Sequence, residues 1–310
     1  MFSLPTVSAA PARIRRPAVF SNADCLAFGK RALALDSMQK AARALSALAN
    51  RLPEGSAWSR QAARAARMAR AAMRGVALPS VFAMDGNSKL PFAAFATLSI
   101  ADCPDAGPCA AWCYSRKAWR YPAAYFRQLL GSLLMRHAPE LIREAFRALP
   151  EGIVLRLYTD GDFRSEADAR FWFRLLAERP DVRAYGYSKA WDALHAARDA
   201  WPDNYVLNLS TGGKPQRVSA EAMKALPGVR GVFAAVPVER AAYAEGRRGN
   251  IGAARYDSPA YHAAVRRSAL PTLGRVFSCP GRCGDCRSDS GKPHACGDIG
   301  FKVPIAIGVH

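Results

Sequence analysis

The sequence lacks long apolar runs and the common signatures of several enzyme classes. Half of its 310 residues are apolar, yet no stretch approaches the roughly 18 consecutive apolar residues that a membrane span needs. It has five histidines and no G-x-G-x-x-G, P-loop or H-E-x-x-H motif. These absences exclude a transmembrane helix and the standard dinucleotide, nucleoside triphosphate and zinc-protease signatures.

The first residues also lack the apolar segment of a secretory signal. Arg13, Arg15 and Arg16 lie near the start, but no apolar region follows them. The composition is compatible with an organelle transit peptide. The abundance of Ala and Arg favours instead a bacterial or phage protein from a GC-rich genome. We therefore expect a cytoplasmic protein with reduced thiols and no membrane partner.

Acidic residues are scarce relative to basic ones. The chain has 44 Lys and Arg against 25 Asp and Glu, a formal net charge of +19. Residues 1–80 alone hold 13 basic and 3 acidic residues. This imbalance favours a polyanionic partner such as nucleic acid, although a codon bias toward Arg would produce the same composition.

Residues 1–80 are predicted to form a basic helical arm attached to a second domain, residues 81–310. After an irregular segment over 1–25, apolar residues at three-to-four spacing predict a helix over 34–50, and a second helix follows over 57–74. Five arginines fall on one face of this second helix: Arg60, Arg64, Arg67, Arg70 and Arg74. Such a stripe fits phosphate contact or a plain solvated face.

From about residue 85, short β-rich runs alternate with helical segments. The runs are 92–100, 153–159, 182–188, 205–210, 231–236 and 274–278, with 303–309 as a seventh candidate. The helical segments lie near 118–148, 165–179, 189–200, 218–226 and 258–269. This alternation predicts a parallel α/β fold. We expect an incomplete (β/α)6 barrel rather than an open doubly wound sheet, because the chemistry-bearing residues follow strands, as at the carboxyl face of a barrel.

Seven of the eight cysteines fall in two clusters, each directly after a predicted strand. The first cluster, C-x5-C-x3-C, contains Cys103, Cys109 and Cys113. The second, C-x3-C-x2-C-x9-C in a Cys-rich C-terminal loop, contains Cys279, Cys283, Cys286 and Cys296. Thiols grouped in this way are typical of metal or iron–sulfur sites. A disulfide framework is disfavoured because a chain of this length needs no such staples. Cys25 stands alone and is expected to be a buried thiol.

The number of thiols in each cluster predicts its chemistry. Four thiolates complete either an iron–sulfur cluster or a tetrahedral zinc site. His294 could replace one cysteine ligand, but we favour a bystander role for it. We favour iron because structural zinc sites usually show two close cysteine pairs, and this loop has one. Three thiolates leave one coordination position open, as in a catalytic site. That loop either holds its own cluster, shares ligands with the second loop, or forms a structural zinc finger.

Polar residues and glycines follow the middle strands. Asp160 and Asp162 flank a glycine after the second run and are candidates for acid–base catalysis or for binding a cofactor amine or ribose, although aspartates are also common at helix starts. Lys189 follows the third run and is a candidate catalytic or anion-anchoring residue. Gly212 and Gly213 after the fourth run would let a backbone approach a cofactor, or simply form a turn. Tyr114, which follows Cys113, is a further cofactor-binding candidate.

Two segments resemble a known family. The segments GNSKLPFAAFATLSIADCPDAGPCAAWCYS and LYTDGDFRSEADARFWFRLLAERPDVRAYGYSKAW resemble the phage and plasmid family named after a mycobacteriophage "gene product 88". They are more distantly similar to phage proteins near the radical S-adenosylmethionine superfamily. The likeness covers roughly residues 85–215 and the cysteine-rich tail, and leaves residues 1–80 outside.

The more distant resemblance implies a particular cofactor set. It implies one or two 4Fe–4S clusters, S-adenosylmethionine on an open iron and a partial, TIM-barrel-like (β/α)6 fold. The first cysteine loop would be the ligand loop, Asp160 and Asp162 the second-strand turn, and Lys189 the third-strand turn. One departure concerns the spacing: the superfamily's usual C-x3-C-x2-C occurs here at the C-terminal loop instead. The gene product 88 family itself implies no settled activity.

Three functional hypotheses follow. The first is an iron–sulfur, radical-S-adenosylmethionine-like redox enzyme of a mobile element, with the reactive cluster on the first loop and an auxiliary cluster on the second. Here Asp160, Asp162, Gly212 and Gly213 would lie near the cofactor. The second is a phage or plasmid protein that binds nucleic acid through its basic arm and uses zinc only for folding. The third is a barrel that keeps its clusters without catalysis.

Overall fold

The computed structural model describes residues 20–78, 81–84, 92–239, 258–281, 283, 286 and 294–309. Most of the segment predicted to be irregular, residues 1–19, lies outside the described residues. The last residues of the segment predicted to be irregular, 22–25, are helical. They belong to α1 (Asn22–Leu33), which begins with a capping box in which the side chains of Ser21 and Asp24 accept each other's backbone N–H. The prediction of an irregular chain up to residue 25 is therefore wrong at residues 22–25.

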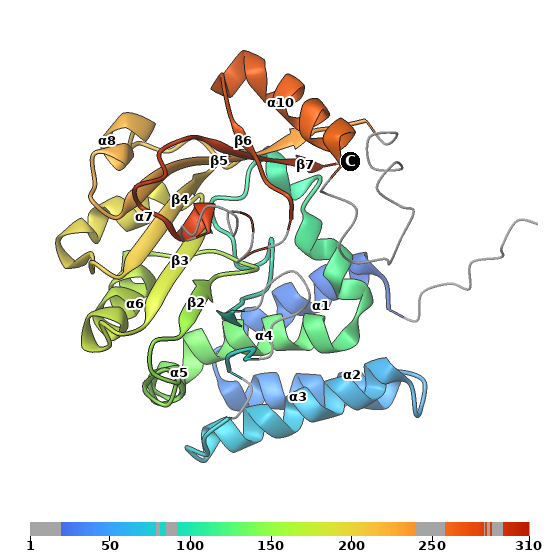
Figure 1. The fold of residues 1–310 in the computed structure, drawn as a ribbon. Helices are drawn as coiled ribbons and strands as arrows, with labels where there is room; N and C mark the ends of the chain where they lie inside the picture. Colours follow the sequence, from blue (N-terminus) through green and yellow to red (C-terminus); the bar gives the residue numbers. More distant parts are fainter. Residues whose placement is uncertain are drawn as a thin grey trace, which may run out of the picture.

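Helices α2 (Met38–Arg51) and α3 (Ala57–Met73) form a hairpin at the edge of the molecule (Figure 1). Their N-termini are capped by the hydroxyls of Ser37 and Ser56. The buried face of α3 is mostly alanine, so the helix packs closely against α2 and against α4 (Pro122–His137). The three N-terminal helices and α4 therefore share one hydrophobic core.

The described residues contain a seven-stranded sheet in which every neighbouring pair is parallel. In sequence order the strands are β1 (Ala93–Ala94), β2 (Val154–Leu157), β3 (Arg183–Ser188), β4 (Tyr205–Ser210), β5 (Val229–Pro237), β6 (Phe277–Ser278) and β7 (Ile305–Val309). Their spatial order is β1-β2-β3-β4-β5-β7-β6. The parallel α/β class is confirmed, the seventh candidate strand is real and lies between β5 and β6, and barrel closure stays a prediction.

Two predicted elements differ in extent. The strand predicted over 92–100 has only two ladder residues. Beyond them Phe95 and Thr97 still donate to the carbonyl oxygens of Arg156 and Asp160, but the register shifts around Tyr158, which has φ +53°. The helical segment predicted near 118–148 contains two α-helices, α4 and α5 (Pro139–Arg147). Pro139 cannot donate a backbone hydrogen bond and disfavours helical geometry at the preceding residue, so α4 ends there.

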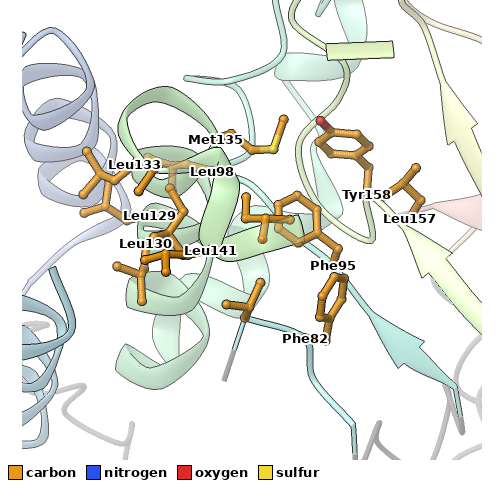
Figure 2. Packing of buried hydrophobic residues seen from close by; sticks show 14 of the residues in the cluster. Phe82, Phe95, Leu98, Leu129, Leu130, Leu133, Met135, Leu141, Leu157 and Tyr158 are labelled. Atoms are coloured by element: carbon orange, nitrogen blue, oxygen red, sulfur yellow. The ribbon is translucent and has the colours of Figure 1, made fainter. Parts of the chain in front are cut away.

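The two faces of the sheet carry different layers. Leu155 and Leu157 of β2 face the main hydrophobic core with α4, α5 and α6 (Glu166–Glu178). Figure 2 shows part of this core, with Leu133 of α4 near Leu98. Helices α7 (Trp191–Ala196) and α8 (Ala220–Lys224) follow β3 and β4, and α10 (Pro259–Leu273) packs on β5 and β7. The opposite face is covered by the C-terminal segment, whose short 3-10 turn (Ala295–Gly297) contacts β3 and β4 (Figure 1).

Candidate metal centre

The first cysteine loop is tied to helix α4 by a buried ion pair. Asp102, directly before Cys103, has a side chain that is 1% exposed. Both of its carboxylate oxygens accept hydrogen bonds from Arg136, at 2.9 and 2.6 Å. A bidentate pair of this kind fixes orientation as well as distance. The position of Cys103 at the end of its strand is therefore set by a contact to α4.

The same loop is tied to the end of β4 through the glycine pair. The Cys109 N–H donates to the Gly212 carbonyl oxygen at 3.0 Å. A Cβ atom added to Gly107 would lie 2.5 Å from the Gly213 carbonyl carbon. Lys214 extends the contact, because its ammonium donates to the Pro104 carbonyl oxygen at 2.7 Å. This close approach of the two backbones explains why glycines occupy positions 212 and 213. Their cofactor-binding role stays a prediction.

The three thiols of this loop lie together in a half-buried position. Burial is the main cause that raises the pKa of Cys103, and Asp162 and Cys113 raise it further, while Lys189 lowers it. Burial also raises the pKa of Cys113, with the nearby charges of Asp160 and Cys109 acting in the same direction. The thiols of Cys103 and Cys113 are therefore protonated at neutral pH unless a cation displaces the protons. The structure brings the predicted ligands Cys103, Cys109 and Cys113 together with both predicted aspartates.

Asp162 works as a clamp between the ends of β2 and β3. Its Oδ1 accepts from the Ser188 hydroxyl at 2.6 Å and from the Phe163 N–H at 2.8 Å, and its Oδ2 accepts from the Lys189 N–H at 2.9 Å. Burial raises its pKa, and these hydrogen bonds oppose the shift. The Lys189 ammonium is in turn bonded to Ser210 Oγ at 2.7 Å. Both side chains thus hold neighbouring strand ends together, and their catalytic roles stay predictions.

Asp160 links the first loop to the second strand. Its carboxylate accepts a hydrogen bond from the Ser115 hydroxyl, and burial raises its pKa. Beside it, the Tyr114 hydroxyl donates to the Thr159 carbonyl oxygen at 3.1 Å. Gly161 between the aspartates has φ +80°, and an added Cβ would lie 1.8 Å from Thr97 Oγ1. Only glycine therefore fits this turn.

The four C-terminal thiols gather on the sheet face that the helices leave uncovered. Cys279, Cys286 and Cys296 pack in one cluster with aromatic residues of β3, β5 and β6. Cys283 is within electrostatic reach of Cys279 and Cys296. Two sulfur atoms already accept backbone N–H groups at 3.4 Å: Cys279 from Gly281 and Cys286 from Ala295. Such N–H donors to sulfur also occur around iron–sulfur clusters, where they tune the metal.

The cysteines of each group lie close together, but closeness alone does not give the geometry of a metal site. Across the described residues, no group of three or more His, Cys, Asp or Glu side chains is arranged to hold a metal ion. No disulfide joins any of the eight cysteines. Burial raises the pKa of Cys296 to about 12, with Cys283 and Cys286 also raising it and Tyr187 and Arg230 lowering it. The metal-ligand roles of Cys279, Cys283, Cys286 and Cys296 therefore stay predictions.

A part-buried arginine that the sequence reasoning missed lies between the two cysteine groups. Arg156 on β2 directs Nη1 toward Cys283 Sγ at 3.9 Å and stacks on the Tyr187 ring, 4.8 Å from its centroid. Its Nε is buried without a hydrogen-bond partner. None of the salt bridges within the described chain involves it. Tyr114 of the first loop is also within electrostatic reach of Arg156 and Cys283. The Asp160 carboxylate is within electrostatic reach of Arg156. A part-buried cation outside the described salt bridges also favours a further anionic neighbour, such as a thiolate.

A second missed pair anchors the backbone of Cys296. Asn208 on β4 donates to the Cys296 carbonyl oxygen at 2.9 Å and accepts from Arg230 Nε at 2.5 Å. The other nitrogens of Arg230, which is 1% exposed, donate to carbonyl oxygens of Phe301 and Val303 and of its own strand. The sequence signal for these residues was a polar side chain inside an apolar strand.

His294 lies beside the same thiols. Its ring packs on Phe92 and Tyr185, with centroids 4.9 and 4.6 Å apart. Its Nε2 is buried without a hydrogen-bond partner, and burial lowers its pKa to about 4, helped by Arg183 and Arg156. The imidazole is therefore neutral at physiological pH, the form that binds metals. A substitute-ligand role for His294 stays open to test.

Comparison with known protein families matches residues 55–288 to the family described as gene product 88. The chain belongs to this family. The predicted resemblance is confirmed, but its extent is corrected: the match begins at residue 55, within the region expected to lie outside, and so includes α3. It contains six of the seven clustered cysteines, while Cys296 lies beyond it. The searches of curated proteins and of solved structures gave no match, so a radical S-adenosylmethionine relation is not shown.

Proposed function

We propose that the protein binds an iron–sulfur cluster through Cys279, Cys283, Cys286 and Cys296. The observation that carries this proposal is the part-buried Arg156 guanidinium, which takes part in none of the salt bridges of the described residues and has Nη1 3.9 Å from Cys283 Sγ. A cluster held by four thiolates is anionic, and a fixed cation next to it offsets that charge. The two backbone N–H groups at 3.4 Å from sulfur support the same assignment.

The donor set also favours iron–sulfur over a single zinc ion. Zinc with Zn–S bonds of about 2.3 Å requires its thiolates close together. A cluster places iron and sulfide between its ligands and suits thiols that share a pocket without forming a single-ion site. When bound, such a cluster would supply one-electron chemistry. Arg156 would offset its charge, and Asn208 would hold the backbone of its last ligand.

The first loop is proposed as the site of a reactive cluster. Its three thiols leave a coordination position open, and S-adenosylmethionine is the cofactor proposed for that position. Asp160 and Lys189 are the polar side chains nearest to this loop that could bind a cofactor amine or carboxylate. In support of a shared site, Tyr114 lies within electrostatic reach of thiols from both loops.

Metal analysis tests this proposal. The protein is purified anaerobically and assayed for iron, acid-labile sulfide and broad visible absorption, with and without S-adenosylmethionine and a reductant. We expect iron and sulfide in equal amounts, with the C-terminal cluster's share lost in Cys283→Ser and the full amount retained in Cys25→Ala, which removes the isolated thiol of α1. Four irons per chain would indicate one cluster and eight would indicate two. A colourless protein that contains only zinc would contradict the proposal.

The second candidate function is nucleic-acid binding with zinc as a folding element. The charge of the α2–α3 hairpin favours it: residues 38–74 contain eight basic residues and one acidic residue, Glu54. Under this alternative the thiols only stabilise the fold. Zinc without iron, together with DNA or RNA binding that weakens steeply with salt, would select it.

A further inference from the structure

The arginine stripe of α3 faces solvent along its whole length. The exposed side chains are Arg60, Arg64, Arg67, Arg70 and Arg74. At 1.5 Å per residue this row extends about 21 Å along the helix. None of the salt bridges in the described part of the chain includes any of the five arginines. The row therefore presents uncompensated positive charge at the edge of the molecule (Figure 1).

The row is rigid because the other side of α3 is packed. Trp58 and five alanines of α3 are buried against α2 and α4. Arg70 reaches across to Ser46 Oγ on α2, and Arg60 donates to the Gly55 carbonyl oxygen in the turn between the helices. The arginine row thus lies beside the seam of the α2–α3 hairpin, where exposed Arg43 of α2 adds to its charge.

We infer that this outward face of the α2–α3 hairpin binds the phosphate backbone of nucleic acid without reading its sequence. The inference rests on the second candidate function and assigns it a surface. Guanidinium groups bind phosphate oxygens in a bidentate manner, so Arg suits this contact better than Lys. Positions beside the arginines, such as Ala63 and Ala71, are small and apolar. They offer no hydrogen bonds to base edges, which direct readout requires.

An anionic membrane is the weaker partner for the same charge. A helix that binds a membrane surface inserts its apolar face among the lipids. On α3 that face is already buried in the core with α4. Only Met73, 48% exposed at the end of the helix, presents a large apolar side chain there. The hairpin could touch lipid headgroups but could not insert.

The test uses the full chain and labelled DNA of about 20 base pairs, as a duplex and as a single strand, measured by fluorescence anisotropy between about 50 and 200 mM salt. If all five arginines contact phosphates, this row should contribute about −4.5 to the slope of log affinity against log salt concentration for the duplex. That contribution corresponds to a several-hundredfold loss of affinity between about 50 and 200 mM salt. An unlabelled competitor of unrelated sequence should compete equally well. Vesicles that contain phosphatidylserine are the membrane arm.

Two charge-matched variants decide the location. The hairpin variant changes the five arginines of the row to Gln, a good helix former. The control changes five exposed cations elsewhere to Gln: Arg174, Arg198, Lys224, Arg266 and Arg267. We expect the hairpin variant to lose at least tenfold in affinity and most of the slope, and the control to retain both. Circular dichroism and thermal melting confirm that each variant is folded, and a milder R64Q/R67Q variant should give an intermediate loss.

Each other outcome overturns a defined claim. If the wild-type chain binds DNA and the two variants bind equally well, the hairpin is not the surface, while the second candidate function stands. If the wild-type chain binds neither form of DNA, nor RNA of the same sequence, both fail. Binding to vesicles without binding to nucleic acid would replace the proposed partner by a membrane.

Discussion

Replacing Arg136 by Met is expected to destabilise the protein by about 4 kcal/mol, because it leaves a buried carboxylate without its partner. Asp102 is 1% exposed, and its described side-chain hydrogen bonds both come from Arg136. The reverse change, Asp102→Asn, should cost only about 1–2 kcal/mol. In that variant the amide oxygen still accepts a hydrogen bond, and the Arg136 side chain, 22% exposed, can turn toward water.

Urea unfolding of the three proteins, with the free energy of unfolding extrapolated to water, measures this difference. Glu178→Gln is the matched control, because its pair with Arg147 is 42% and 56% exposed and should contribute less than about 1 kcal/mol. A cost for Arg136→Met below that of Asp102→Asn, or equal to that of the control, would refute the assignment of Asp102 as a buried charge that anchors the first loop.

Three further predictions follow from the site. Gly161→Ala should lower the free energy of unfolding by about 3 kcal/mol, since φ is +80° and the new Cβ would meet the side chain and backbone of Thr97. Gly152→Ala, at φ +68° with nothing within 4 Å, should cost only about 1 kcal/mol in the same thermal or urea melts. Asn208→Leu should reduce metal content per chain by releasing the backbone of Cys296, and unchanged content would count against this anchor. Burial raises the pKa of the Cys103, Cys279 and Cys296 thiols, so metal uptake must release protons. Chelator competition should show a metal affinity that rises up to tenfold per pH unit for each proton released, between pH values of about 6 and 8. A metal affinity that does not depend on pH would contradict this prediction.

The order and length of strands were only partly predictable. Apolar β-rich runs marked β2, β3 and β4 closely because each of these strands pairs on both sides and buries apolar side chains on at least one face. The spatial order was not accessible, since nothing in a local pattern says that β7 (Ile305–Val309) lies between β5 and β6. The shortness of β1 depends on a register shift in its neighbour: Phe95 and Thr97 donate to Arg156 and Asp160 on either side of Tyr158, which has φ +53°.

The residues of the candidate site were also only partly predictable from the sequence. Clustered thiols stand out in any sequence, and their spacing predicted two groups after two strands. Arg156 and Asn208 each stand alone inside an apolar run, and such a residue has several local explanations. What decides their role is the period of two along a strand: Leu155 and Leu157 face the helices, while Arg156 faces the other side. A polar residue on that face of the sheet can be assigned to a site only when the segment that covers the face is known.

The C-terminal segment covers that side as a nearly irregular chain, and this explains why the polar residues are there. An irregular chain pressed on a sheet carries carbonyl groups with no secondary structure to satisfy them. Arg230 donates hydrogen bonds to the carbonyl oxygens of Phe301 and Val303, and Asn208 donates one to the carbonyl oxygen of Cys296. Arg156 differs, because its only described hydrogen bond goes to a cysteine sulfur. Of the three, Arg156 is therefore the one whose position the described hydrogen bonds explain least, and an anionic centre at the thiols would explain it.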